Sequence, residues 1–160
     1  MTDAGLVLEK REHAARVLRE ILERMGIEAE VSAFDEADRV ILDAHGPESG
    51  LVIGKKGATL DALQYLVNRI VSRKPNDGPL IIVDAEGYRG RREESLGEVA
   101  RNLAQKAVDS GRPVPAEPMS AQDRRILHVA LADHPGVVTE SEGEGLFRRV
   151  VVRPKTVTGA

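Results

Sequence analysis

The sequence lacks cysteine, tryptophan and any long apolar run. With no cysteine among its 160 residues, it has no disulfide, no thiolate zinc site and no cysteine nucleophile, and we expect a cytoplasmic setting. Apolar runs, such as those at residues 51–53, 80–83 and 150–152, are at most four residues long. The N-terminus also lacks a basic region followed by an apolar stretch, so we expect neither a membrane span nor a secretion signal.

Aromatic side chains are nearly absent as well. Those that occur are Phe34, Tyr65, Tyr88 and Phe147. Many proteins that bind single strands stack the bases on exposed aromatic rings, and this sequence offers little material for such a surface. We therefore do not expect a nucleic-acid surface built on stacked rings.

The remaining composition is that of a folded protein. With 41% hydrophobic and 31% charged residues, the chain is globular in character, and its length suits one domain or two small ones. The net charge of −3 is unevenly spread: residues 1–50 carry 6 basic and 12 acidic side chains, residues 51–110 carry 10 and 8, and residues 111–160 carry 7 and 6. The later basic residues are clustered, which can create positive patches on an acidic protein.

The start of the chain predicts a helix followed by a hairpin. Apolar residues three and four apart predict a helix over about residues 8–25, with Gly26 as its C-terminal cap. Alternation of apolar and polar residues predicts strands at 27–34 and 39–45, joined by a turn. We expect these two strands to form a hairpin.

A second helix and a third strand follow. A short, partly helical stretch at 48–53 precedes a strong helix, whose predicted buried face consists of Leu60, Leu63, Val67, Ile70 and Val71. A dense turn signal at 75–79 leads into a buried strand at 80–83. Because helices separate this strand from 39–45, we expect the two strands to be parallel neighbours in a mixed sheet.

The second half repeats the mixture of helix and strand. The predicted elements are a long helix at 91–110, an extended edge strand or loop at 113–119, a helix at 120–132, and strands at 137–141 and 147–153. Ser120 and Asp123 form a capping-box pattern at the start of the shorter helix. A boundary near Gly87 divides the chain into two small α/β units.

The segment Gly54-Lys55-Lys56-Gly57 carries the strongest chemical signal in the first half. Two glycines let another backbone approach closely, and the following helix N-terminus and two ammonium groups favour a phosphodiester. A P-loop is excluded because Ser49 stands where its first glycine belongs, which disfavours nucleoside triphosphates. Taken alone, a Gly-x-x-Gly segment is also typical of plain surface turns.

The surroundings of this loop favour nucleic-acid binding. Val52 and Ile53 precede the loop, Leu60 follows it, and predicted strands lie on both sides. This arrangement resembles a KH domain, in which a GXXG loop clamps about four nucleotides. The extra helix and strand at the N-terminus resemble the bacterial, type II form, and the resemblance covers roughly residues 8–86.

Arg124 and His128 carry the main signal in the second half. At 3.6 residues per turn they share one stripe of their helix, whereas Ile126 and Leu127 lie opposite. We expect His128 on an exposed face, where Arg124 can grip a phosphate and the imidazole can add a second donor. The spacing alone is also found on solvated helix faces with an incidental histidine.

The wider sequence adds a resemblance to this pair. An Arg-x-x-x-His helix between an extended segment and two strands resembles the R-three-H domain, a small binder of single-stranded nucleic acid. After the KH-like unit, the stretches at 88–96, 117–119, 123–128 and 141–151 resemble the Jag family, also called SpoIIIJ-associated proteins. In this family we expect many relatives to carry a further N-terminal domain and linker, and a Pro-containing turn where this chain has Gly145-Leu146.

The resemblance implies an α+β fold of two small units. We expect a type II KH-like domain (a helix, a three-stranded mixed sheet and helices) at 1–87. An R-three-H domain (a three-stranded sheet with two helices) follows at 88–155, with a tail at 156–160. The implied function is non-catalytic binding of single-stranded RNA, with single-stranded DNA as a second ligand. The implied protein uses no cofactor and no metal, and regulates gene expression after transcription in connection with cell envelope growth or division.

The implied partners and binding residues follow from the same resemblance. A small single-KH-domain protein and a second copy of the chain are the implied protein partners. The residues expected to bind RNA are Ile53, Gly54, Lys55, Lys56, Gly57, Arg89, Arg92, Arg124, Arg125, His128, Arg148 and Arg149.

Two other classes of function remain open from the sequence. An enzyme could use His128 with Asp133 and His134, or His45 beside Asp43, but neither group forms a metal or triad signature. A protein adaptor is the stronger alternative, since the family name records association with a membrane insertase. Its partner could bind the acidic first helix, which carries Glu9, Glu12, Glu20 and Glu23.

Overall fold

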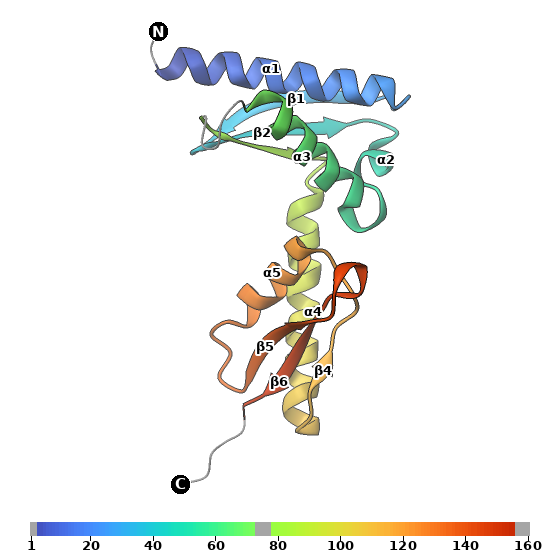
Figure 1. The fold of residues 1–160 in the computed structure, drawn as a ribbon, viewed down its shortest axis with the longest axis vertical. Coiled ribbons are helices and arrows are strands. Elements are labelled where there is room, and N and C mark those ends of the chain that lie inside the picture. The colour runs from blue at the N-terminus through green and yellow to red at the C-terminus, as the bar shows by residue number, and fades with distance from the viewer. Residues whose placement is uncertain (1–2, 73–77, 156–160) are drawn as a thin grey trace. The chain divides into compact units, whose positions relative to one another are not determined.

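The computed structural model describes residues 3–72 and 78–155. The chain divides into two compact units, residues 1–89 and 90–160 (Figure 1). Within the described residues, each unit has one sheet of three strands. This confirms the predicted α+β class of two small units.

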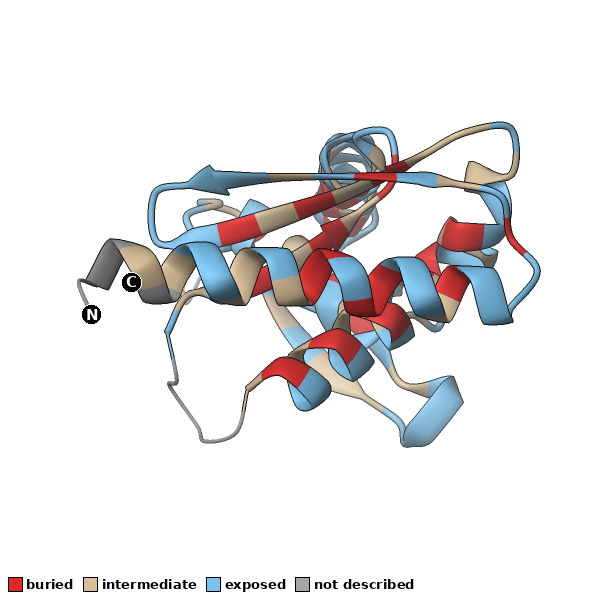
Figure 2. Cartoon of the chain, turned by 90° about the horizontal axis from the view of Figure 1, so that it is seen from above, coloured by how far each residue is buried: buried red, intermediate tan, exposed pale blue. Residues whose placement is uncertain are grey.

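The first unit begins with α1 (Asp3–Arg24). Its residues Leu18 and Leu22 are at most 1% exposed, and Figure 2 shows buried positions alternating with exposed ones along the helix. Gly26 ends the helix at φ +72°, and its N–H donates to the carbonyl of Glu23. The predicted glycine cap is therefore confirmed, because this left-handed conformation suits glycine.

A hairpin follows, as predicted. Strands β1 (Glu30–Glu36) and β2 (Arg39–His45) pair antiparallel. In β2 the side chains of Val40, Leu42 and Ala44 are fully buried on one face of the sheet. Residues between these positions therefore point to the opposite face.

The next elements return the chain to the same sheet. Helix α2 (Ser49–Ile53) leads into the 3₁₀ turn η1 (Lys55–Gly57), then α3 (Ala58–Val71) and β3 (Leu80–Asp84). Strand β3 pairs in parallel with β2, which confirms the predicted crossover pairing. The turn predicted at 75–79 lies mostly outside the described residues.

One residue of the predicted α3 core is on the surface. The helix buries Leu60, Leu63, Val67 and Val71, whereas Ile70 is 52% exposed. At 3.6 residues per turn, Ile70 lies at the margin of the buried stripe, so the prediction for this residue was wrong.

Side-chain amides of α3 cover the outer edge of β3. Asn68 donates through Nδ2 to the carbonyl of Ile81 at 2.7 Å and accepts from its N–H at 3.2 Å. One turn earlier, Gln64 accepts from the N–H of Val83 at 3.0 Å. Because an exposed strand edge can pair with other chains, these amides complete the sheet within the unit.

The second unit packs two helices on one face of its sheet. Its elements are α4 (Tyr88–Ser110), β4 (Val114–Pro115), α5 (Ala121–Leu131), β5 (Val137–Glu142), the 3₁₀ turn η2 (Gly145–Phe147) and β6 (Arg149–Pro154). The central strand β6 is antiparallel to both neighbours. The core joins the small side chains of Ala100 and Ala104 on α4 to Leu127 of α5 and Val150 of β6.

Two local expectations in this unit have different outcomes. Ser120 caps α5 as predicted, since its hydroxyl oxygen accepts from the N–H of Asp123 at 3.2 Å. Phe147, predicted as the first residue of the last strand, instead belongs to the turn η2 and is 79% exposed. Among residues 3–72 and 78–155, no helix is long and apolar enough to cross a membrane.

The amide cover of β3 gives a stability prediction. We expect Asn68→Ala to lower the free energy of unfolding by about 1–3 kcal/mol, because two part-buried backbone groups lose their partner. Hydrogen exchange at the Ile81 amide should accelerate. The exposed neighbour Arg69, changed to Ala, provides the control. Equal exchange at Ile81 in both variants would contradict this role of Asn68.

Candidate nucleic-acid interface

The loop Gly54–Gly57 has a backbone that depends on its glycines. Gly54 and Gly57 have φ of +70° and +81°. A Cβ on Gly54 would overlap the hydroxyl oxygen of Thr59, and one on Gly57 would lie 2.8 Å from the Tyr88 ring. Both glycines are therefore required by conformation and by space.

This tight loop presents two cations beside a helix N-terminus. The side chains of Lys55 and Lys56 are exposed, whereas Gly57 is buried. Helix α3 starts directly after the loop at Ala58, whose N–H donates to the Lys55 carbonyl within the loop, and the positive end of the helix dipole favours an anion there. Ile53 is half-buried and packs against the core, so it forms an apolar edge of the loop. This combination suits a phosphate backbone.

Two arginines that the sequence assigns to RNA have partners inside their own units. Arg89 donates to Asp61 at 2.9 Å, Gln64 at 3.1 Å and the Val83 carbonyl at 2.8 Å. Arg92 donates to Asp123 at 2.7 Å, a carboxylate that is only 5% exposed. A buried carboxylate needs such a partner. We therefore assign both arginines a structural role.

Arg124 and His128 contact hydroxyl side chains of β5 rather than facing open solvent. His128 places Nδ1 2.7 Å from Thr139 Oγ1 and Nε2 2.9 Å from Ser141 Oγ. Arg124 reaches the same Ser141 hydroxyl at 3.4 Å, and its Nε is buried without a hydrogen-bond partner among the described residues. The expected exposed stripe is therefore a half-buried polar cluster. Thr139 and Ser141 are members that the sequence analysis missed.

The charge state of His128 follows from this cluster. Partial burial lowers its pKa from the ordinary 6.5, and the nearby positive charge of Arg124 lowers it further. A neutral imidazole has one donor and one acceptor, which match the two hydroxyls on β5. His128 thus holds the Ser141 hydroxyl that Arg124 also approaches, and its lowered pKa favours the neutral imidazole.

The other predicted arginines lie elsewhere in the second unit. Arg125 is exposed and borders a groove of about 660 Å³ between α4 and α5 that also contains Glu93, Glu94 and Glu98. Arg101 also lines this groove, but the three carboxylates outnumber the two arginines, which does not favour phosphate. Arg124 and Arg125 therefore belong to different surfaces.

Arg148 and Arg149 lie at the β5–β6 hairpin. Arg148 donates to the Gly143 carbonyl at 2.9 Å. Arg149 is exposed and pairs in register with Glu142. Because Val150 faces the core, Arg149 points to the opposite face of the sheet from Ser141, which is the register partner of Val150. Arg149 therefore lies on the other face of the hairpin from the Arg124 cluster, and Arg148 is held at the turn.

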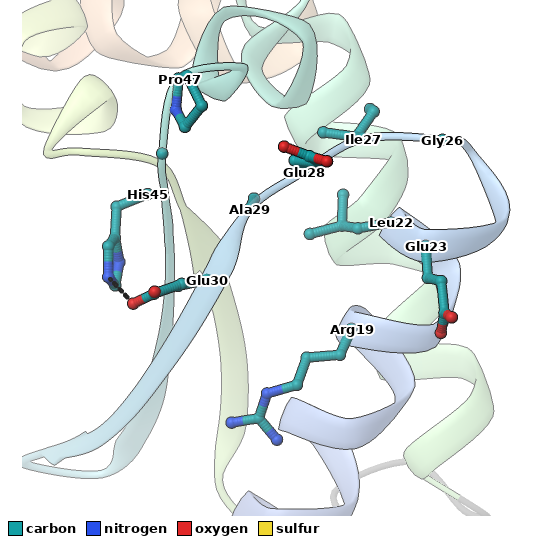
Figure 3. A pocket seen from close by; sticks show the side chains of 11 residues that line it. Arg19, Leu22, Glu23, Gly26, Ile27, Glu28, Ala29, Glu30, His45 and Pro47 are labelled. Atoms are coloured by element: carbon teal, nitrogen blue, oxygen red, sulfur yellow. Dashed lines mark ion pairs between the residues drawn. The ribbon is translucent and has the colours of Figure 1, made fainter.

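A large cavity in the first unit, whose lining side chains Figure 3 shows, includes none of the loop residues Gly54–Gly57 in its lining. It measures about 860 Å³ and lies between the end of α1 and the adjoining ends of β1 and β2. Arg19 is its single arginine, and the Nη2 of this residue donates to the Val31 carbonyl at 2.9 Å. The carboxylate of Glu30 lies 3.4 Å from His45 Nε2. Its mixed lining does not resemble a phosphate site.

Comparison with known proteins gives both units a family. Residues 11–82 match the family described as the KhpA/KhpB KH domain. Residues 94–154 match the R-three-H domain. A KH domain followed by an R-three-H domain defines a class of two-domain proteins.

Several curated proteins share both domains with this chain. RNA-binding protein KhpB of Clostridium symbiosum is 37% identical over 147 residues, which cover 91% of this chain and 66% of the relative. Its namesake in Bacillus subtilis is 32% identical over 146 residues, covering 90% and 70%. That of Streptococcus pneumoniae is 29% identical over 159 residues, covering 95% and 48%. The chain belongs to the KhpB family, also called Jag, and spans about two thirds of the first two relatives and about half of the third.

The lowered pKa of His128 gives a pH prediction. Below about pH 6.5 the unfolded chain binds a proton at this residue more readily than the folded chain does. The free energy of unfolding should therefore fall as pH drops from about 7 to 5.5. The variant His128→Gln should lose the part of this pH dependence that comes from His128, while the control His13→Gln should keep it. Urea unfolding at pH 7 and at pH 5.5 measures the free energy of unfolding. An NMR titration that gives His128 a pKa above 6.5 would contradict the prediction.

Proposed function

We propose that this chain is a non-catalytic binder of single-stranded RNA with two separate grips. The first grip is the loop Gly54–Gly57, and the second is the surface around Arg124 in the R-three-H unit. The observation that carries the proposal is the loop itself, whose two glycines are fixed by conformation and space. It exposes Lys55 and Lys56 at a helix N-terminus.

The chemistry of the two grips differs. Ammonium groups and backbone N–H groups at the loop bind the phosphates of a strand that passes across it. At Arg124, a half-buried guanidinium offers a planar fork for one phosphate. Each grip is small, and joining two of them on one chain raises the overall affinity through effective concentration. Single-stranded DNA carries the same phosphate groups and is a second ligand of these sites.

The relatives support this proposal and its biological setting. Those matched over most of the chain carry the name RNA-binding protein KhpB. Resemblance to the Jag family further suggests post-transcriptional regulation linked to cell envelope growth or division. It also suggests a small single-KH-domain protein, or a second copy, as partner, and a cytoplasmic location.

The open face of the first sheet favours a protein adaptor as the second candidate. Phe34, Ile41 and Ile82 form one row across the three strands, and Phe34 is 48% exposed. The adjoining row contains the carboxylates of Asp43 and Asp84. The carboxylates repel the phosphates of nucleic acid. Together with the apolar row, they suit a basic protein segment.

Charge reversal at the loop tests the first grip. We expect Lys55→Asp with Lys56→Asp to abolish most affinity for single-stranded RNA without unfolding the chain, because both side chains are exposed. Fluorescence anisotropy with a labelled oligonucleotide measures the affinity. Arg16→Asp with Arg24→Asp, two exposed residues of α1, makes the same change of charge away from the loop and should bind almost normally.

Crosslinking in the protein's own cells, followed by sequencing of the bound RNA, separates the two candidate functions. RNA binding predicts enriched transcripts that the loop variant loses. Absence of enrichment over background would favour the adaptor. Enrichment retained by the loop variant would assign RNA binding to another surface.

A salt titration tests the second grip. Arg124→Ala should weaken binding and reduce the slope of log affinity against log salt by about one, as expected for one lost phosphate contact. Arg124→Lys should keep most of the slope and lose affinity, because the charge remains and the planar fork is lost. Equal slopes for the native chain and Arg124→Ala would rule out a phosphate contact there.

A further inference from the structure

The tip of the β5–β6 hairpin exposes two large apolar side chains. Leu146 is 93% exposed and Phe147 is 79% exposed. Among the described residues, neither belongs to the core cluster of the second unit nor to the partly buried residues packed against it. Burial of the Phe147 ring therefore does not stabilise the fold, although aromatic side chains are usually largely buried.

The turn that carries Phe147 has a defined shape. Gly143 has φ +86°, and a Cβ there would lie 2.9 Å from the Phe147 carbonyl oxygen. The N–H of Phe147 donates to the Glu144 carbonyl at 3.1 Å. Arg148 closes the turn from its other end by donating to the Gly143 carbonyl at 2.9 Å. These bonds hold the ring-bearing backbone in place, which reduces the ordering cost of binding.

Cations flank the exposed ring on its C-terminal side. Arg148 and Arg149 follow Phe147 directly, and Arg149 is exposed. Ser141, which Arg124 contacts at 3.4 Å, lies opposite Val150 in the register of the same hairpin. Glu144 is an exposed carboxylate in the turn, so the tip itself is not strongly charged. Two cationic side chains thus lie within two residues of a solvent-facing ring in the sequence.

We propose that Phe147, with Leu146 beside it, is a stacking surface for an unpaired nucleobase. This rests on the proposed RNA binding and names the base-contacting element of the second grip. Proteins that hold single strands combine cations for the backbone with aromatic rings for the bases. This chain places one such ring at the tip of the hairpin whose strand β5 contributes Ser141 to the Arg124 cluster. The contact tolerates any base, because every base has a π-face.

The arginines favour a base over a protein or a lipid as the occupant. A partner protein that buried Leu146 and Phe147 would also have to desolvate Arg149 or supply a carboxylate for it. A single strand brings an apolar base and an anionic phosphate together in each nucleotide, so one ligand satisfies both groups. Charge complementarity therefore identifies the occupant as nucleic acid.

A tryptophan at this position tests the stacking directly. The chain contains no tryptophan, so Phe147→Trp introduces a single fluorophore that a stacked base quenches. We expect quenching by a short single-stranded RNA of mixed sequence, and none by an abasic oligonucleotide of equal length that keeps the phosphates. Phe34→Trp places the same fluorophore in the first unit and should not respond in this way.

An affinity measurement complements the fluorescence. Phe147→Ala should weaken RNA binding by about fivefold or more, the effect of losing one stacked base, and leave affinity for the abasic oligonucleotide unchanged. Phe147→Tyr should bind like the native chain. Circular dichroism checks that each variant is folded, which we expect because Phe147 packs against no core residue in the described chain.

The outcomes separate the stacking proposal from the proposed function. RNA that binds the native chain, but neither quenches Phe147→Trp nor distinguishes Phe147→Ala, would overturn the stacking role and leave RNA binding intact. Failure of the native chain to bind any single strand would overturn both. Emission of Phe147→Trp that shifts with protein concentration alone would assign the tip to self-association instead.

Discussion

The architecture around the glycine loop depends on the guanidinium of Arg89. It joins the Val83 carbonyl at the end of β3 to Asp61 and Gln64 on α3. Asp61 lies in the first turn of α3, the helix whose N-terminus the loop presents. The residue before Arg89, Tyr88, leaves no room for a side chain at Gly57. One internal cation thus fixes the helix start and the ring that together define the loop, and the lysines at its tip are exposed to solvent.

The second unit uses polar groups in the same way. Arg92 neutralises the nearly buried Asp123, whose backbone N–H is held by Ser120. His128 bridges Thr139 and Ser141, and so fixes the hydroxyl that Arg124 approaches. The lowered pKa keeps this imidazole neutral near pH 7, which preserves its acceptor and avoids repulsion with Arg124. In this cluster His128 therefore holds the hydroxyl that Arg124 contacts, and Arg124 is the charged member.

Elements of both units were predictable from local patterns, but the partners of the charged residues were not. Helix periodicity, the Gly26 cap and the Ser120 cap depend on neighbours within a few residues. The pair Arg92–Asp123 joins residues 31 positions apart, and no local pattern distinguishes it from two surface charges. The helical wheel correctly placed Arg124 and His128 on one stripe. It could not reveal that β5 covers this stripe, although Thr139 and Ser141, alternating after the buried Val137, were the available signal.

Composition and position lead to different conclusions about aromatic residues. Four rings in a chain of 160 residues argue against a stacking surface as a general feature, yet one ring at a hairpin tip is enough to hold one base. Both proposed contact points are turns shaped by glycines with positive φ, Gly54 and Gly57 in one and Gly143 in the other. Each exposes side chains that the core does not need. Because each contact is small, affinity must come from their linkage on one chain, and effective concentration provides it without a new interface.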